Sequence, residues 1–158
     1  MTVSRKKMDE KFRKTLVIIP ARGGSKRIPQ KNIKEICGQP MIHWPLKIIS
    51  NIFEPRNVLV STDCYKIKDV VEARGLKVPF MRPKDLSDDL TGTTEVVMHA
   101  LDWYEKNVET VDYVLIVYPT SILLKADDLK VAMRTLSESI ECDSIMSASK
   151  FPVPPQWA

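Results

Sequence analysis

The sequence lacks the features that mark a disulfide-rich, a secreted or a membrane-spanning protein. It has only three cysteines, Cys37, Cys64 and Cys142, and no CxxC pair. An odd number of widely spaced cysteines excludes a disulfide framework and favours buried, unreactive thiols in a reducing cytosol. The N-terminal region has no apolar segment typical of a secretory signal, and no apolar run is long enough to span a bilayer. We therefore expect a cytoplasmic protein without a membrane partner.

One stretch of the chain, residues 22–34, has no acidic residue. Residues 22–34 contain five basic side chains and no acidic one, whereas the whole chain has a net charge of only +4. The rest of the chain therefore sums to −1, and a local excess of this kind is typical of an anion-binding site. Residues 1–14 are also basic and are expected to form a disordered leader. Residues 15–158 are expected to form one domain with a hydrophobic core.

Apolar runs and helical patterns alternate along the chain. Apolar, β-branched runs predict strands at 15–21, 57–62, 77–81, 113–120 and 143–148. Helical spacing predicts helices at 41–52, 65–73, 93–106 and 126–139. This alternation predicts a three-layer, Rossmann-like α/β fold with a mainly parallel sheet. The continuous run at 113–118 is typical of a strand buried on both faces. The final proline-rich segment has no strand or helix period, so the fold is expected to be C-terminally incomplete.

Polar residues follow four of the predicted strands. They are "ARGGSKRIPQKN" at 21–32, Asp63, "RPKDLSDD" at 82–89 and "YPTS" at 118–121. In open α/β sheets, ligands bind beyond the carboxyl ends of the strands, where these segments are expected to meet. The convergence of four polar exits predicts one ligand site at that edge.

The first of these segments has the chemistry of a phosphate-binding loop. Gly23 and Gly24 allow a tight turn that presents backbone N–H groups to a phosphate. Arg22 can grip phosphate oxygens with its guanidinium fork, and Lys31 supplies a point charge. Neither the GxxxxGK[ST] nor the GxGxxG pattern is present. The loop therefore predicts phosphate binding outside both common motif classes.

Several alternatives stay open at this point. A solvated basic loop or a nucleic-acid patch would also explain the charge, but no aromatic residue lies between Arg22 and Glu35 to stack on bases. We therefore expect no nucleic-acid partner. Asp63 could approach the site or cap the following helix. The pair Asp88 and Asp89 could contact a sugar or a metal, or form a solvated turn.

Four blocks of the sequence resemble one known family. They are "IPARGGSKRIPQKNIKEICGQPMI" (19–42), "VLVSTD" (58–63), "RPKDLSDDLTGTTEVVMHAL" (82–101) and "YPTSILLKADDL" (118–129). Their order and spacing are similar to those of the acylneuraminate cytidylyltransferases, which make CMP-activated nine-carbon sugar acids. "SKRIP", "YPT" and "FPVPPQ" are most similar to the pseudaminic acid members. Ile122 departs from the proline usual after "PTS".

The resemblance implies a reaction and a set of site residues. The anomeric hydroxyl of a nonulosonic acid attacks the α-phosphorus of CTP, and pyrophosphate leaves. Arg22 and Lys31 match the catalytic positions that hold the triphosphate, and Arg82 matches a position facing the cytosine. The implied nucleotide-binding set is Ala21, Arg22, Gly23, Ser25, Lys31, Asn32, Arg82, Thr91 and Thr93. The implied sugar-side set is Tyr118, Thr120 and Ser121, with Tyr118 in place of the glutamine of sialic acid enzymes.

The resemblance also implies a cofactor and a partner. Members of the family use Mg²⁺, and the ligands are expected beyond residue 158. They form homodimers, so a homodimer is expected here. Pseudaminic acid is the first expected substrate and N-acetylneuraminic acid the second, with 3-deoxy-manno-octulosonate as a less similar alternative. A non-catalytic remnant that binds only nucleotide or a partner is the alternative from another functional class.

Overall fold

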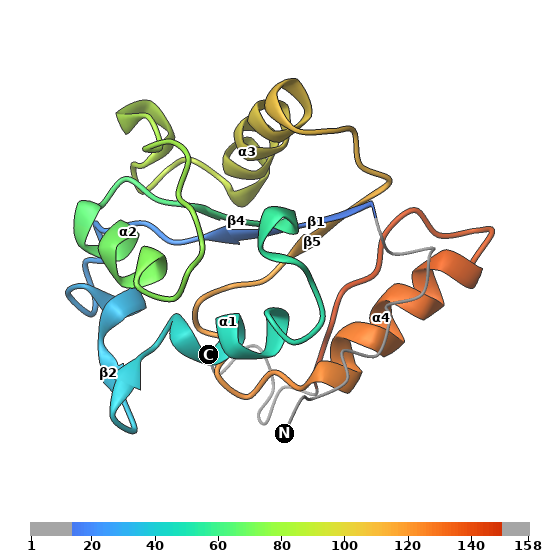
Figure 1. Ribbon diagram of the computed structural model, residues 1–158, viewed down its shortest axis with the longest axis horizontal. Coiled ribbons are helices and arrows are strands. Elements are labelled where there is room, and N and C mark those ends of the chain that lie inside the picture. The colour runs from blue at the N-terminus through green and yellow to red at the C-terminus, as the bar shows by residue number, and fades with distance from the viewer. Residues whose placement is uncertain (1–13, 150–158) are drawn as a thin grey trace, which may run out of the picture. The chain divides into compact units, whose positions relative to one another are not determined.

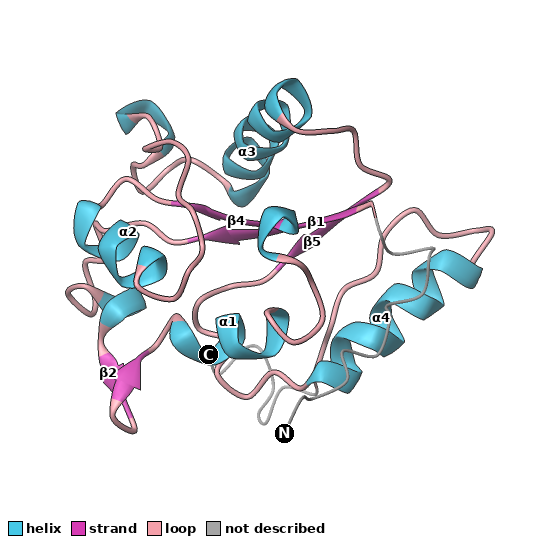
Figure 2. Cartoon of the chain, in the orientation of Figure 1, coloured by secondary structure: helices cyan, strands magenta, loops and turns pink. Residues whose placement is uncertain are grey.

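The computed structural model describes residues 14–149, which belong to two compact units, residues 1–126 and residues 127–158. Each unit is described by itself. The described part of the first contains β1 (Thr15–Pro20), η2 (Lys31–Ile33), β2 (Glu35–Ile36), β3 (Gln39–Pro40), α1 (His43–Ile49), η3 (Pro55–Asn57), β4 (Val58–Ser61), α2 (Tyr65–Glu72), η4 (Lys84–Leu86), α3 (Thr93–Asn107) and β5 (Tyr113–Ile116). The described part of the second contains α4 (Ala126–Glu138) from its second residue onward. Figures 1 and 2 show these elements in one orientation.

The main sheet has three parallel strands in the order β4-β1-β5. Val17 in the central strand lies opposite Val58 on one side and Leu115 on the other. The predicted parallel arrangement is therefore confirmed for these strands. All three carboxyl ends consequently lie along one edge of the sheet. β1 ends at Pro20, which has no amide hydrogen to donate, and the Ala21 amide makes the last hydrogen bond to β4.

Helices cover both faces of this sheet. On one face, α3 packs in a cluster formed by Leu16, Ile18, Leu59, Val97, Ala100 and Tyr104. Figure 1 shows α1 on the opposite side of the sheet from α3. Because side chains alternate along a strand, Val17 and Ile19 point away from α3, and both are fully buried. Burying one such side chain contributes roughly 1.5–3 kcal/mol. The central strand is thus held from both sides, which fixes the loop that follows it.

The four predicted helices are present as α1, α2, α3 and α4. α2 ends where the sequence predicted, because Gly75 follows it in the left-handed region with φ of 78°. The helical spacing predicted at 126–139 is confirmed in α4, whose buried residues Leu129 and Met133 lie four positions apart on one face. Helical spacing was a sufficient signal here because each helix has a well-defined apolar face.

The strand predicted at 77–81 is wrong. The segment alternates in burial like a strand, and Val78 is 3% exposed. Its amide, however, donates to the Glu72 carboxylate at 3.2 Å, and Pro79 has no amide hydrogen to donate. An extended segment without a neighbouring ladder is not a strand, although its side-chain pattern is the same.

Two further strand predictions need correction. Residues 143–148 form no strand, and all of them are exposed, including the apolar pair Ile145–Met146. The strand β5 is present but is not buried on both faces. It lies at the edge of the sheet, and Ile116 is 41% exposed. The buried strands are β4, all of whose residues are buried, and β1, whose residues are buried up to Ile19.

The cysteines also differ from expectation. All three thiols are free, but Cys37 and Cys142 are exposed, so the prediction of buried thiols is wrong for these two. Cys37 occupies the turn of a hairpin formed by β2 and β3, with φ of 50°, next to Gly38 with φ of 78°. Turn formation there requires two residues with positive φ, which places the side chain outside the core. Within residues 14–149, no helix is long and apolar enough to cross a membrane.

Candidate functional site

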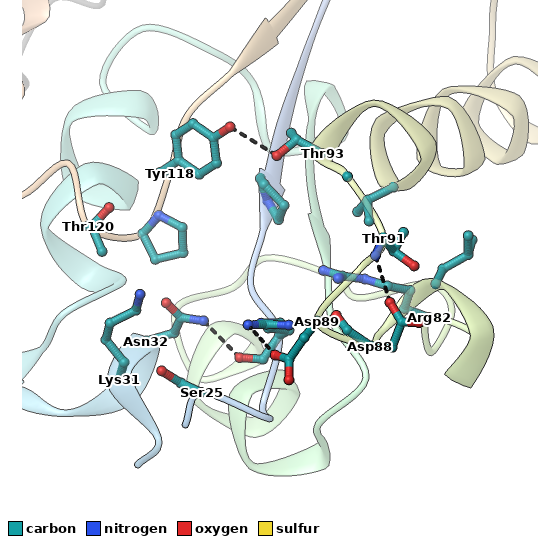
Figure 3. A pocket seen from close by; sticks show the side chains of 16 residues that line it. Ser25, Lys31, Asn32, Arg82, Asp88, Asp89, Thr91, Thr93, Tyr118 and Thr120 are labelled. Atoms are coloured by element: carbon teal, nitrogen blue, oxygen red, sulfur yellow. Dashed lines mark hydrogen bonds and ion pairs between the residues drawn. The ribbon is translucent and has the colours of Figure 1, made fainter. Parts of the chain in front are cut away.

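A cavity of about 260 Å³ opens at the carboxyl edge of the sheet. Pro20 at the end of β1 lines it, as do the segment after β5 and the first turn of α3 (Figure 3). Nine of the twelve predicted site residues line this cavity. They are Arg22, Ser25, Lys31, Asn32, Arg82, Thr91, Thr93, Tyr118 and Thr120. Residues from distant parts of the chain therefore meet at the edge that the parallel topology predicts.

The other three predicted residues do not line the cavity. Ala21, Gly23 and Ser121 instead donate backbone hydrogen bonds in the segments around it. The Ala21 amide donates to the Ser61 carbonyl at 2.9 Å, which continues the β1–β4 ladder. The Gly23 amide donates to Asp63 Oδ1 at 2.8 Å. The Ser121 amide donates to the Tyr118 carbonyl at 3.0 Å and closes a turn. Their contribution is to hold the loops that carry the lining side chains.

The basic loop is paired with an acidic residue that sequence reasoning did not assign to it. Arg22 Nη2 lies 2.9 Å from Asp89 Oδ1, and Lys26 forms an ion pair with the other oxygen of the same carboxylate. Arg22 Nη1 also donates to the Asp88 carbonyl at 2.6 Å. The hydrogen bond from Lys26, followed by the charges of Lys26 and Arg22, lowers the pKa of Asp89. The basic loop therefore already binds one anion of the chain itself, the Asp89 carboxylate.

The acidic segment is itself a closed turn. Asp88 Oδ1 accepts hydrogen bonds from the amides of Leu90 at 3.0 Å and Thr91 at 2.7 Å. Hydrogen bonds from Thr91 lower the pKa of Asp88. The Thr91 hydroxyl donates to the Asp85 carbonyl at 3.1 Å. Asp88 thus folds the turn, while Asp89 projects toward the basic loop (Figure 3). Of the readings that the sequence left open for this pair, a simple solvated turn describes Asp88 only.

Asn32 holds the backbone of the basic loop through a side-chain hydrogen bond. Its side chain is 6% exposed, and Nδ2 donates to the Arg22 carbonyl at 2.9 Å. Its own carbonyl accepts from the Ile42 amide at 2.9 Å, which anchors it to the start of α1. Lys31 lies beside it on the cavity wall, and its ammonium forms no ion pair with any residue of 14–149. An unpaired cation on a cavity wall is available to an anionic ligand.

Arg82 brings a second, buried guanidinium to the cavity. It is 6% exposed, Nε donates to Ser61 Oγ at 3.0 Å, and Nη2 donates to the Ser61 carbonyl. Its own amide donates to the Thr62 carbonyl at 2.7 Å. Burial lowers the pKa of Arg82, the negative charge of Asp63 raises it, and the positive charge of Arg22 lowers it. The guanidinium is therefore fixed in direction before any ligand arrives.

The helix α3 begins at the cavity and adds partial positive charge. Gly92 and Thr93 line the cavity at the first turn, where backbone N–H groups of a helix are unpaired. The Thr93 hydroxyl and the Tyr118 hydroxyl lie 3.1 Å apart and form a hydrogen bond. Figure 3 shows Tyr118 and Thr120 on the side of the cavity opposite Arg82. The cavity thus has a cationic loop, a buried guanidinium and a hydroxyl-bearing side.

The described residues, 14–149, contain no cluster of three or more potential metal ligands among their His, Cys, Asp and Glu side chains. The two carboxylates of the cavity are engaged, Asp89 with cations and Asp88 with amides. Mg²⁺ is commonly bound by one or two carboxylates together with water and substrate phosphates, so a group of three side chains is not a requirement. The expectation that the ligands lie beyond residue 158 stays a prediction.

A comparison with family models identifies the family of the chain. The family model described as "Cytidylyltransferase" matches residues 16–151, which is most of the chain. The chain belongs to the cytidylyltransferase family. The resemblance predicted from the sequence blocks is therefore confirmed. The match includes the loop after β1, residues 82–93 and the segment after β5, all of which contribute lining residues to the cavity.

Curated cytidylyltransferases are similar along nearly the whole chain. A pseudaminic acid cytidylyltransferase of Campylobacter jejuni is 39% identical over 92% of this chain and 62% of its own length. A CMP-N,N'-diacetyllegionaminic acid synthase of Legionella pneumophila is 31% identical over 90% of this chain and 60% of its own. An N-acylneuraminate cytidylyltransferase of Streptococcus agalactiae is 35% identical over 87% of this chain. The chain thus spans about 60% of the first two relatives.

A solved structure has the same fold. The CMP:2-keto-3-deoxy-manno-octonic acid synthetase, a structure described as complexed with CTP, aligns with a TM-score of 0.64. The alignment covers 81% of this chain and 49% of that chain, with 24% sequence identity. This likeness establishes a shared α/β fold.

Proposed function

We propose that this chain carries the nucleotide site of a cytidylyltransferase that transfers CMP from CTP to a nonulosonic acid, with pseudaminic acid as the first substrate. One observation carries the proposal. In a member of this family, Arg22, Lys31 and the buried Arg82 line one cavity at the carboxyl edge of the sheet. Three cations around a cavity that also receives a helix N-terminus favour a polyphosphate ligand.

The proposed reaction is an in-line displacement at phosphorus. The anomeric oxygen of the sugar acid forms a bond to the α-phosphorus, and the bond to the β-phosphate oxygen breaks. Pyrophosphate leaves, and the proton of the anomeric hydroxyl passes to solvent. Catalysis of such a step rests on positioning and on neutralising charge. Arg22 and Lys31 are proposed to bind the triphosphate and stabilise the departing pyrophosphate.

The two remaining parts of the substrates are assigned to opposite sides of the cavity. Arg82 is proposed to face the cytosine, because its guanidinium is held by two hydrogen bonds to Ser61 and keeps further donors. Fixed donors distinguish bases by the acceptors they present. Tyr118, Thr120 and Ser121 are proposed to form the sugar side, because hydroxyl groups suit a polyhydroxylated acid. Asn32 and Ser25 are assigned to the loop that surrounds the phosphates.

Further assignments remain proposals that follow from the family. Mg²⁺ is the proposed cofactor, with ligands outside residues 14–149. A homodimer is the proposed assembly, and the cytoplasm is the proposed location, because CTP is made and used there. When bound, Mg²⁺ would neutralise charge on the triphosphate.

The test is CTP-dependent release of pyrophosphate with a panel of sugar acids. The panel contains pseudaminic, N-acetylneuraminic, N,N'-diacetyllegionaminic and 3-deoxy-manno-octulosonic acids, each with Mg²⁺ and with CTP or UTP. We expect CTP-specific release, fastest with pseudaminic acid and lost in Arg22→Ala. Release with 3-deoxy-manno-octulosonic acid alone would overturn the substrate class. No release with any acid would leave a nucleotide-binding domain without transferase activity and would overturn the proposed function of this chain.

A further inference from the structure

An aspartate outside the predicted site set holds the start of the basic loop. The Gly23 amide donates to Asp63 Oδ1 at 2.8 Å, across 40 residues of sequence. The alternative in which Asp63 caps the next helix does not apply. The N-cap residue of α2 is Cys64, and no side chain caps that helix. The Asp63 carboxylate is therefore directed to the loop.

Close contact between the two segments makes this hydrogen bond specific. A Cβ atom at Gly23 would lie 2.6 Å from Cys64 Cβ and 3.2 Å from Cys64 Sγ. Real Cβ atoms do not approach another carbon so closely, so only glycine fits at this place. At Gly24, the next residue, no atom lies within 4 Å of the place that a Cβ atom would take, so there is room for a side chain. The basic loop is in close contact with the segment after β4 at Gly23 but not at Gly24.

The same exit also holds the buried guanidinium. Ser61 accepts from Arg82 through both its hydroxyl and its carbonyl, and the Thr62 carbonyl accepts from the Arg82 amide. Residues 61–63 thus join the basic loop on one side of the cavity to Arg82 on the other. Asp63 is the charged member of this junction. The negative charge of Asp63 raises the pKa of Arg82, whereas the positive charge of Arg22 lowers it.

We propose that Asp63 is a positioning residue for the nucleotide. Its carboxylate fixes the Gly23 amide, and with it the direction in which Arg22 and the rest of the loop face the phosphates. The inference rests on the proposed nucleotide site and deepens it. Binding to a loop that is ordered beforehand avoids the cost of ordering it at the moment of binding. Asp63 touches neither substrate and acts through the backbone of Gly23.

The first measurement is amide hydrogen exchange in the ligand-free 158-residue chain, followed by NMR. We expect the Gly23 amide to exchange at least about tenfold more slowly than the Gly24 amide, which has no hydrogen-bond partner among the described residues. Asp63→Ala should remove this protection, whereas Asp63→Asn keeps an oxygen acceptor and should retain it. Asp69→Asn, an equal charge change on the exposed side of α2, is the control. Equal exchange of Gly23 and Gly24 in the unaltered chain would overturn the inference without any variant.

The second measurement is the affinity for inorganic pyrophosphate by calorimetry. We expect Asp63→Ala to bind about tenfold more weakly than the unaltered chain. Asp63→Asn should bind no more weakly, because it keeps the acceptor and removes a negative charge from the site. A structural role alone would lower the stability of both variants and leave the affinity of the folded fraction unchanged, which would overturn the inference. If the unaltered chain binds neither pyrophosphate nor CTP, the proposed function fails, while the exchange measurement still decides the role of Asp63.

Discussion

Arg22 and Asp89 form an ion pair of 2.9 Å that joins the loop after β1 to the turn before α3. The same carboxylate also pairs with Lys26. One carboxylate thus pairs with two cations of the basic loop, so the three groups together keep a net charge of +1. A phosphate that binds Arg22 must compete with Asp89, so this pair couples ligand binding to the position of the acidic turn.

The first prediction concerns removal of this competitor. Asp89→Asn should bind CTP about two- to fivefold more tightly, because the cations then no longer exchange one anion for another. Calorimetry with CTP measures the change. The control is Asp102→Asn, which removes an exposed ion pair of 3.5 Å with Lys106 on α3 and should leave the affinity unchanged. Weaker binding in Asp89→Asn would mean that Asp89 supports the nucleotide instead of competing with it.

The second prediction concerns acid. The hydrogen bond from Lys26 and the charges of Lys26 and Arg22 lower the pKa of Asp89 in the folded chain. A carboxyl group whose pKa is lowered on folding stabilises the fold at pH values above its ordinary, unfolded pKa of about 3.9. This stabilisation is lost as the pH falls through the lower pKa of the folded chain. The contact between the two loops should therefore persist through pH 5 and disappear only below about 3.9. Carbon-13 NMR of the Asp89 carboxyl measures this directly. A midpoint above the ordinary value would refute the pairing.

The third prediction uses neighbouring glycines. Gly23→Ala forces a Cβ atom to within 2.6 Å of Cys64 Cβ, so the loop or the β4 exit has to move. We expect a loss of about 1–3 kcal/mol in the free energy of unfolding, together with weaker CTP binding. Gly24→Ala is the matched control, because nothing lies within 4 Å of its Cβ position. Urea denaturation of both variants measures the difference, and equal stabilities would contradict the close contact.

The fourth prediction concerns the sugar side. Tyr118→Phe removes the hydroxyl that lies 3.1 Å from the Thr93 hydroxyl but keeps the ring. If Tyr118 faces the sugar acid, the KM for the acid should rise severalfold while CTP affinity stays within about twofold. Tyr113→Phe, within β5, serves as the control. A large loss of CTP affinity with an unchanged KM for the acid would assign Tyr118 to the nucleotide side.

The place of the site was predictable because it follows from topology. Alternating strands and helices predict a parallel sheet, and a parallel sheet brings its carboxyl ends together. The glycines and cations after the first strand then identify the phosphate side, and their partners "RPKDLSDD" and "YPTS" fall at the same edge. That inference needs only the order of strands and helices, and not the contacts between individual residues.

The contacts within the site were not predictable in the same way. The pairing of Arg22 with Asp89 and of Gly23 with Asp63 joins residues 67 and 40 positions apart, and no local pattern encodes either contact. The strand predictions failed where side-chain periodicity was separated from hydrogen bonding. Val78 alternates like a strand residue, yet its amide is satisfied by a side chain. The exposure of β5 depends on what packs against its faces, which its apolar run does not determine, since β4 at the other edge of the sheet is fully buried.

The central claim is that this cavity binds CTP, and one measurement tests it most directly. Calorimetry of the 158-residue chain with CTP, UTP, GTP and ATP, each with Mg²⁺, should show binding of CTP at least about tenfold tighter than of the other three. Arg22→Ala should weaken CTP binding about tenfold or more, because it removes a charge-assisted contact to the phosphates. Equal binding of all four nucleotides, no binding of CTP, or an unchanged affinity in Arg22→Ala would contradict the account.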